Sequence, residues 1–179
     1  MHLWHDVKHE INEKDKTFLG IIEIPKGSSH KYELNKDYGI MQLDRMLSMP
    51  VEYPENYGFI PQTYCDDKDP LDILVLSEKS IAPSTLVTVR PIGVMKMVDG
   101  GEKDDKLICV HASDPIYESC YDIKDLPKNL KERLKRFFEC YKKFENKKVK
   151  IDKFFGQKEA WRILKESIDM YEKSYKGKK

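Results

Sequence analysis

The sequence predicts an α+β fold in which a small, closed or nearly closed β-barrel carries helices on one side. The first two thirds of the chain contain short runs of β-branched and aliphatic residues separated by turn signals. The last third changes to the three-to-four-residue periodicity of amphipathic helices. Many short strands followed by helices favour a sheet that curves on itself and packs its helices on the outside.

The predicted strands alternate with turns rich in glycine, proline, aspartate and serine. Two clear turn signals are Pro25-Lys26-Gly27-Ser28 and Asp99-Gly100-Gly101. The strands are expected at residues 17–24, 31–34, 40–47, 71–76, 86–98 and 106–111.

Two helices are expected after the strands. Asp125 and Pro127 mark the start of the first, and Gly156 precedes the second. The first is indicated by Leu126, Leu130, Leu134, Phe137, Phe138, Tyr141 and Phe144, and the second by Ala160, Trp161, Leu164, Ile168 and Tyr171.

Length and composition predict one globular domain spanning residues 1–179, with a core of its own. The net charge is +1 although 35% of the residues are charged, so the basic excess typical of nucleic-acid binders is missing. No apolar run approaches the roughly 20 residues that a membrane span requires. The first residues do not resemble a signal peptide, and Cys65, Cys109, Cys120 and Cys140 lack short paired spacing. These features predict a cytoplasmic protein with reduced thiols.

The stretch Asp67-Lys68-Asp69-Pro70-Leu71-Asp72 places three carboxylates directly before the apolar run 73–76. Asp69 precedes a proline and is therefore expected to be extended. Asp72 falls within a predicted buried strand, where an unpaired carboxylate is costly. Converging carboxylates suit a hard cation such as Mg²⁺ or Mn²⁺. The stretch therefore indicates half of a metal site, with an acidic surface turn as the alternative. An EF-hand calcium loop is disfavoured, because the glycine at its sixth position and the glutamate at its twelfth are missing.

Other predicted strands carry charges where a simple core would not. An antiparallel sheet with one solvated face explains any one of them alone. Together they combine carboxylates, which gather divalent cations, with lysine and arginine, which bind phosphate oxygens. Such a mixture suits phosphoryl transfer to water. The acids are Glu23, Glu33, Asp67, Asp69, Asp72, Asp99 and Asp104, and the bases are Lys31, Arg45 and Lys106.

These residues resemble the soluble inorganic pyrophosphatases of the barrel type, known as family I. The family signature Asp-x-Asp-Pro-x-Asp is matched by Asp67, Asp69, Pro70 and Asp72. The resemblance extends in order from about Glu23 to Lys142, most of the chain. Its further blocks are Ile22-Glu23-Ile24-Pro25, Lys31-Tyr32-Glu33, Asp44-Arg45, the run 53–61, Arg90-Pro91-Ile92-Gly93-Val94, the run 99–106 and Phe137-Phe138-Glu139-Cys140-Tyr141-Lys142.

The resemblance implies a five-stranded OB-like barrel that hydrolyses pyrophosphate to two phosphates. It implies several Mg²⁺ ions per site, with Mn²⁺ as a second candidate, and a bridging water as nucleophile with Asp69 as its general base. The implied metal ligands are Asp67, Asp72, Asp99, Asp104 and Glu33. The implied phosphate-binding residues are Lys31, Glu33, Arg45, Tyr57, Lys106, Tyr141 and Lys142, of which Lys31, Arg45 and Tyr57 also take part in catalysis. Glu23 and Tyr53 would support this network.

The resemblance also implies a homo-oligomer, with a hexamer favoured, and the aromatic residues Trp4 and Trp161 outside the obvious core agree with it. One position departs from some relatives, which have an acid where this chain has Gly100, and Glu102 is a candidate replacement. Two alternatives remain. One is a phosphohydrolase of longer polyphosphates or nucleotides. The other is a nucleic-acid-binding barrel, which the clustered acids disfavour because they would repel a phosphate backbone.

Overall fold

Five strands form a ring in the computed structural model, which describes residues 1–145 and 149–176. Their order is β1-β4-β5-β8-β6, and the additional pairing of β1 with β6 completes the ring. The β5–β8 pairing is parallel and the others are antiparallel. The strands are β1 (Phe18–Ile24), β4 (Asn56–Phe59), β5 (Asp72–Leu76), β6 (Leu86–Asp99) and β8 (Lys106–His111). The α+β class and the ring of five strands confirm the coarse prediction.

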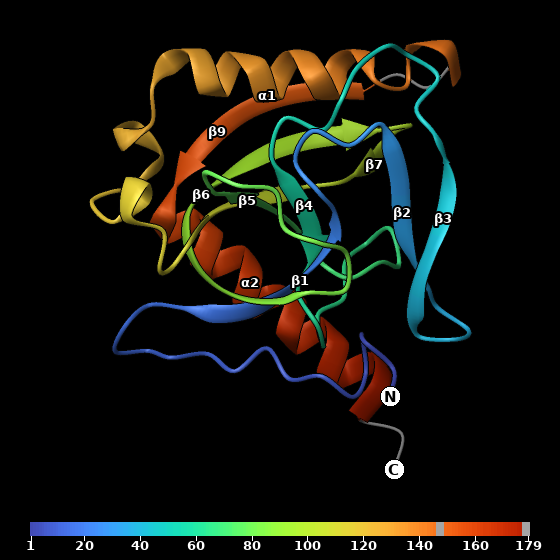
Figure 1. Ribbon diagram of the computed structural model, residues 1–179. Helices are drawn as coiled ribbons and strands as arrows, with labels where there is room; N and C mark the ends of the chain where they lie inside the picture. The colour runs from blue at the N-terminus through green and yellow to red at the C-terminus, as the bar shows by residue number, and fades with distance from the viewer. Residues whose placement is uncertain (146–148, 177–179) are drawn as a thin grey trace.

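The remaining strands extend or overhang this ring. β7 (Glu102–Lys103) and β9 (Val149–Gly156) both pair with the long strand β6. β2 (His30–Asn35) and β3 (Ile40–Met46) form a separate two-stranded sheet that stands beside the ring in Figure 1. This hairpin and the ring enclose the space in which most of the predicted site residues lie.

The helices lie on different sides of the ring (Figure 1), so the prediction that both lie on one side is wrong. α1 is Lys128–Cys140 and α2 is Gln157–Tyr171, with short 3-10 turns at Pro115–Tyr117, Ile123–Asp125 and Lys143–Glu145 and a π-turn at Glu172–Lys176. Both predicted helices are confirmed. The apolar periodicity had suggested that the first continues to Phe144, but that residue lies in a separate 3-10 turn and is exposed. No helix in the described part of the chain is long and apolar enough to cross a membrane.

The strands β4, β7 and β9 were not predicted from the sequence. β4 contains Asn56 and Gly58, which are poor strand formers in isolation. Gly58 is required by tertiary contact: a Cβ there would come within 1.9 Å of the carbonyl oxygen of Ile21 on β1. β9 alternates apolar and charged residues only from Val149 to Asp152, and its pairing with β6 defines the strand as far as Gly156.

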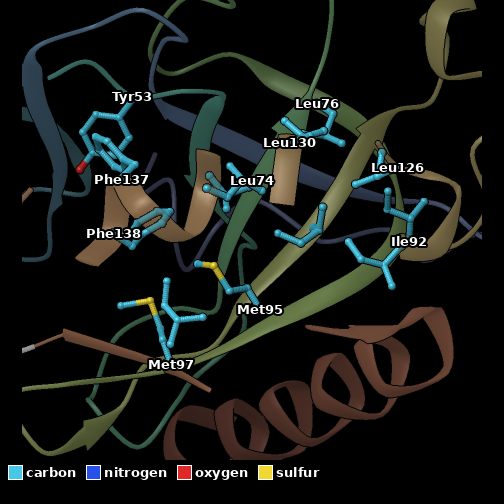
Figure 2. Packing of buried hydrophobic residues seen from close by; sticks show 14 of the residues in the cluster. Tyr53, Leu74, Leu76, Ile92, Met95, Met97, Leu126, Leu130, Phe137 and Phe138 are labelled. Atoms are coloured by element: carbon cyan, nitrogen blue, oxygen red, sulfur yellow. The ribbon is translucent and has the colours of Figure 1, made fainter. Parts of the chain in front are cut away.

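The largest core cluster lies between the ring and α1, as Figure 2 shows. Leu130, Leu134, Phe137 and Phe138 recur on one face of α1 and are buried. Each such side chain contributes about 1.5–3 kcal/mol when fully buried. Their partners on the strands include Leu74, Leu76, Ile92, Met95 and Met97. The close packing fixes the end of α1 relative to the ring.

The two tryptophans pack within the chain, so their presence does not indicate a subunit interface. Trp4 is only 2% exposed and clusters with Leu34 and Tyr171, which joins the N-terminal segment, the β2–β3 hairpin and α2. Trp161 is half-buried and meets Phe18 edge-on, with ring centroids 6.0 Å apart. The cysteines are free, as predicted.

Candidate active site

One polar cavity of about 550 Å³ brings together the predicted site residues from distant parts of the sequence. Of the site residues predicted from the sequence, all of which the structure describes, only Arg45 is absent from its lining. Those that line it are Glu23, Lys31, Glu33, Tyr53, Tyr57, Asp67, Asp69, Asp72, Asp99, Asp104, Lys106, Tyr141 and Lys142.

The centre of the cavity is set by strand register. Parallel pairing of β5 with β8 places Asp72 beside Lys106, each the first residue of its strand. Lys106 is only 2% exposed, and its ammonium contacts the carboxylates of both Asp72 and Asp104. Tyr57 on β4 donates its hydroxyl hydrogen to Asp72 Oδ2 at 2.5 Å. Burial alone would lower the pKa of Lys106, but the two carboxylates raise it well above its usual range. Lys106 is therefore a fixed positive charge at the base of the cavity.

The signature stretch forms a tight loop before β5. The amide of Cys65 donates to the carbonyl of Asp69 at 2.9 Å, and the amide of Lys68 donates to the carbonyl of Cys65 at 3.0 Å. Lys68 has a left-handed backbone, with φ of 67°. The amide of Asp69 donates to Asp67 Oδ1 at 3.1 Å. Burial raises the pKa of Asp67 to about 7, opposed by this bond and helped by the negative charge of Asp72.

Glu23 reaches the cavity because of an irregularity in β1. Ile22 pairs with Gly58 and Ile24 with Tyr57, so Glu23 is the additional residue of a β-bulge, a feature that redirects a side chain. Its Oε1 accepts a hydrogen bond from the amide of Leu34 on β2 at 2.9 Å. Burial, together with the charge of Asp72, raises the pKa of Glu23 to about 8, although the Leu34 bond opposes this. Glu23 thus joins the ring to the hairpin.

The hairpin contributes two cations joined by a carboxylate that the sequence did not single out for a role. Lys31 pairs with Arg45 across β2 and β3. The Lys31 ammonium lies 2.5 Å from Glu33 Oε2 and 3.1 Å from Asp44 Oδ2. The Arg45 guanidinium contacts the same Asp44 oxygen, which explains why Arg45 stands beside the cavity and does not line it. Asp44 was missed because a carboxylate on an exposed strand gives no signal of this bridging position.

The end of β6 supplies the next carboxylate. Asp99 is the last residue of β6 and its carboxylate contacts the Lys142 ammonium. The tight turn that follows needs glycines, with φ of 59° at Gly100 and 96° at Gly101. Glu102, opposite Asp99 across the turn, also lines the cavity. The positive φ of the turn therefore explains the glycine at position 100, where the sequence departs from some relatives. Glu102 lines the same wall of the cavity as Asp99.

The C-terminal end of α1 closes another wall. Tyr141 follows directly after α1 and is buried, and Lys142 lies with its ammonium 5.2 Å from the Tyr141 ring centroid. Tyr53 packs against Phe137 with ring centroids 4.8 Å apart and against Tyr57 at 5.5 Å. Figure 2 shows Tyr53 beside Phe137. These aromatic contacts hold the wall of the cavity to the helix.

The oxygen donors of the cavity suit a divalent cation chemically. Asp99 Oδ1 is buried without a hydrogen-bond partner, and burial raises the pKa values of Asp67 and Glu23, so an added positive charge would stabilise these carboxylates. As the side chains stand, no three His, Cys, Asp or Glu residues within 1–145 and 149–176 are arranged around a common ion position. Lysine ammonium groups contact Asp72, Asp104, Asp99 and Asp69 instead. A cation held by Asp72, Asp99 and Asp104 would share these carboxylates with the ammonium groups of Lys106 and Lys142.

Comparison with known proteins shows what this chain is similar to. The family model described as inorganic pyrophosphatase matches residues 20–172. A soluble inorganic pyrophosphatase of Chlamydomonas reinhardtii is 49% identical over 99% of this chain and 92% of its own length. One of Solanum tuberosum is 48% identical over 95% of this chain and 80% of its own length. The crystal structure of inorganic pyrophosphatase from Thermus thermophilus superposes with a TM-score of 0.91 at 35% identity, covering 96% of this chain and 99% of that one.

Proposed function

Because this chain belongs to the inorganic pyrophosphatase family, we propose that the carboxylate-lined cavity is where it hydrolyses pyrophosphate to two phosphates. The observation that carries this proposal is the convergence in one cavity of Asp67, Asp69, Asp72 and Asp104 with the buried cation Lys106. Neither set of charges alone would suit the substrate. Carboxylates hold the cations that a highly anionic substrate needs, and fixed ammonium groups bind its oxygens.

The phosphate-binding role falls to residues from three walls of the cavity. Lys31 comes from the hairpin, Lys106 from the ring and Lys142 from the end of α1. Tyr57 and Tyr141 add hydroxyl donors, and Arg45 would join them by turning from Asp44 toward the substrate. Charged donors held in place before the reaction stabilise the negative charge that develops during phosphoryl transfer.

The cofactor we propose is Mg²⁺, with Mn²⁺ as a second candidate. Asp67, Asp72, Asp99, Asp104 and Glu33 would hold it, since hard cations prefer carboxylate oxygens. When bound, the cations supply positive charge for the phosphate oxygens and make a nearby water more acidic. Pyrophosphate would otherwise add negative charge to a cavity already rich in carboxylates.

Asp69 is the proposed general base, which takes a proton from the attacking water. The tight loop and the following proline fix its backbone, as a positioned base requires. Glu23, held by the Leu34 amide, and Tyr53, held among aromatic rings, would keep the surrounding hydrogen bonds in place.

Phosphate release from pyrophosphate, measured with and without Mg²⁺, tests the proposal. Rapid release that requires the cation is expected, with tripolyphosphate and ATP as parallel substrates. Faster release from either of those would favour the alternative of a general phosphohydrolase. Full activity after exhaustive chelation would refute the role assigned to the carboxylates.

We further propose a single domain with a closed OB-like barrel, a cytoplasmic location and a homo-oligomer, a hexamer being favoured. The β1–β6 pairing supports closure, and the free cysteines suit a reducing compartment. Exposed apolar side chains on β3, at Ile40, Leu43 and Met46, support assembly. Light scattering over a dilution series tests the last point, and a fully active monomer would contradict it.

A further inference from the structure

A lysine outside the family signature contacts the carboxylate that we propose as the general base. The Lys36 ammonium forms an ion pair with Asp69 Oδ1 and donates a hydrogen bond to the carbonyl oxygen of Lys68 at 3.3 Å. Lys36 also lines the cavity. It therefore reaches both the side chain of the proposed base and the backbone immediately before it.

The turn that carries Lys36 is held rigidly by its own hydrogen bonds. Asn35 Oδ1 accepts from the amides of Asp37 and Tyr38, both at 3.0 Å. The amide of Gly39 donates to the carbonyl of Asn35 at 2.7 Å, and Gly39 has a positive φ of 71°. Such side-chain-to-backbone bonds define the turn locally.

The N-terminal segment holds the same turn from outside. The amide of Leu3 donates to the carbonyl of Gly39 at 2.9 Å, and His2 Nε2 lies 3.0 Å from the carbonyl oxygen of Lys36. A Cβ added at Gly39 would come within 2.4 Å of the His2 ring. The backbone of Lys36 is therefore fixed on both sides, unlike that of an ordinary lysine in an exposed turn.

The loop that Lys36 contacts depends on few other bonds. Its residues from Cys65 to Asp69 bond mainly to one another, and Lys68 holds the less favourable left-handed conformation. Lys36 connects this loop to the hairpin through the Lys68 carbonyl and the Asp69 side chain. A contact at both points restrains the position and the rotation of the carboxylate.

We propose that Lys36 is a positioning residue for Asp69, an inference that rests on the proposed role of Asp69 as base. Lys36 holds Oδ1 of the carboxylate, which leaves Oδ2 to accept the proton from the attacking water. A small misplacement of a catalytic group costs rate and leaves substrate binding largely intact. A lysine that served only to attract the anionic substrate would instead change KM and would act independently of Asp69.

Replacement of Lys36 separates these roles. Lys36→Ala is expected to lower kcat about tenfold with KM unchanged, and Lys36→Arg to recover most of the loss because arginine retains the charge and the donors. Lys68→Ala is the matched control, since it removes a charge of the same sign from the residue next to Asp69, and the Lys68 ammonium forms no ion pair among the described residues. Thermal melting of each variant verifies folding. Equal effects of Lys36→Ala and Lys68→Ala, or a rise in KM alone, would overturn the inference.

A double-mutant cycle tests whether Lys36 acts through Asp69. Lys36→Ala should slow the wild-type enzyme but have little further effect in an Asp69→Asn background. If Asp69→Asn keeps wild-type turnover, the proposed base is wrong and the positioning role is refuted with it. If Asp69→Asn is slow and Lys36→Ala slows both backgrounds equally, the base stands and only the role of Lys36 is refuted.

Discussion

Asp69→Asn should separate catalysis from folding at the proposed base. Asparagine has the same shape, and the loop bonds at this position use backbone atoms: the Asp69 amide to Asp67 Oδ1 and the Cys65 amide to the Asp69 carbonyl. The change removes the charge that pairs with Lys36. Both side chains of that pair are 46% exposed, so its loss costs at most about 1 kcal/mol of stability. Loss of a general base lowers turnover by about 10²–10⁴, or roughly 3–5 kcal/mol of activation free energy.

The predicted result is therefore a variant with near-normal unfolding free energy and a kcat reduced by at least two orders of magnitude, roughly the lower limit for loss of a base. Phosphate release at saturating Mg²⁺ gives kcat, and urea denaturation gives the unfolding free energy. Asp66→Asn is the matched control, because Asp66 lies in the same loop, is exposed and does not line the main cavity. Near-normal turnover of Asp69→Asn would refute the assignment of the base. A comparable loss in Asp66→Asn would show that loop charge, and not Asp69, controls the rate.

Three further predictions concern metal binding, inhibition by Ca²⁺ and the stability of the fold. Asp72→Asn should raise the Mg²⁺ concentration needed for half-maximal activity, and an unchanged Mg²⁺ titration would remove Asp72 from the proposed ligands. Ca²⁺ should inhibit competitively with Mg²⁺, because it prefers longer bonds and more ligands; equal rates with either ion alone would mean that the cations only neutralise charge. Asp114 accepts hydrogen bonds from the Glu78 amide and the Ser77 hydroxyl, both at 2.8 Å, so Asp114→Ala should cost about 1–3 kcal/mol in urea denaturation at pH 7. The hydrogen bond from the Glu78 amide is the main reason why the pKa of Asp114 lies below its usual value. The stabilisation is therefore present above the unfolded pKa of about 3.9 and is lost as the pH falls through the lower folded pKa. A difference in unfolding free energy between wild type and Asp114→Ala that did not narrow in acid would contradict the reasoning.

The sequence determined the local features of this protein because their causes are local. The Asp69–Pro70 step and the run after Asp72 specify a turn followed by a buried strand, and the period of Leu130, Leu134 and Phe138 specifies a helix with one buried face. The family signature is also a contiguous stretch of sequence. The chemical class of the site could thus be predicted before any residue was placed.

The tertiary structure decided which of those residues meet. Only the parallel register of β5 and β8 sets Lys106 beside Asp72, and only the bulge in β1 redirects Glu23 toward the hairpin. β4 exists because Gly58 lets two backbones approach closely, which no local propensity encodes. The position of Asp44 between Lys31 and Arg45 and the reach of Lys36 to Asp69 depend on how the hairpin stands over the ring. Contacts between segments distant in the chain leave no periodic or compositional signal in the sequence, so they can be identified only from the tertiary structure.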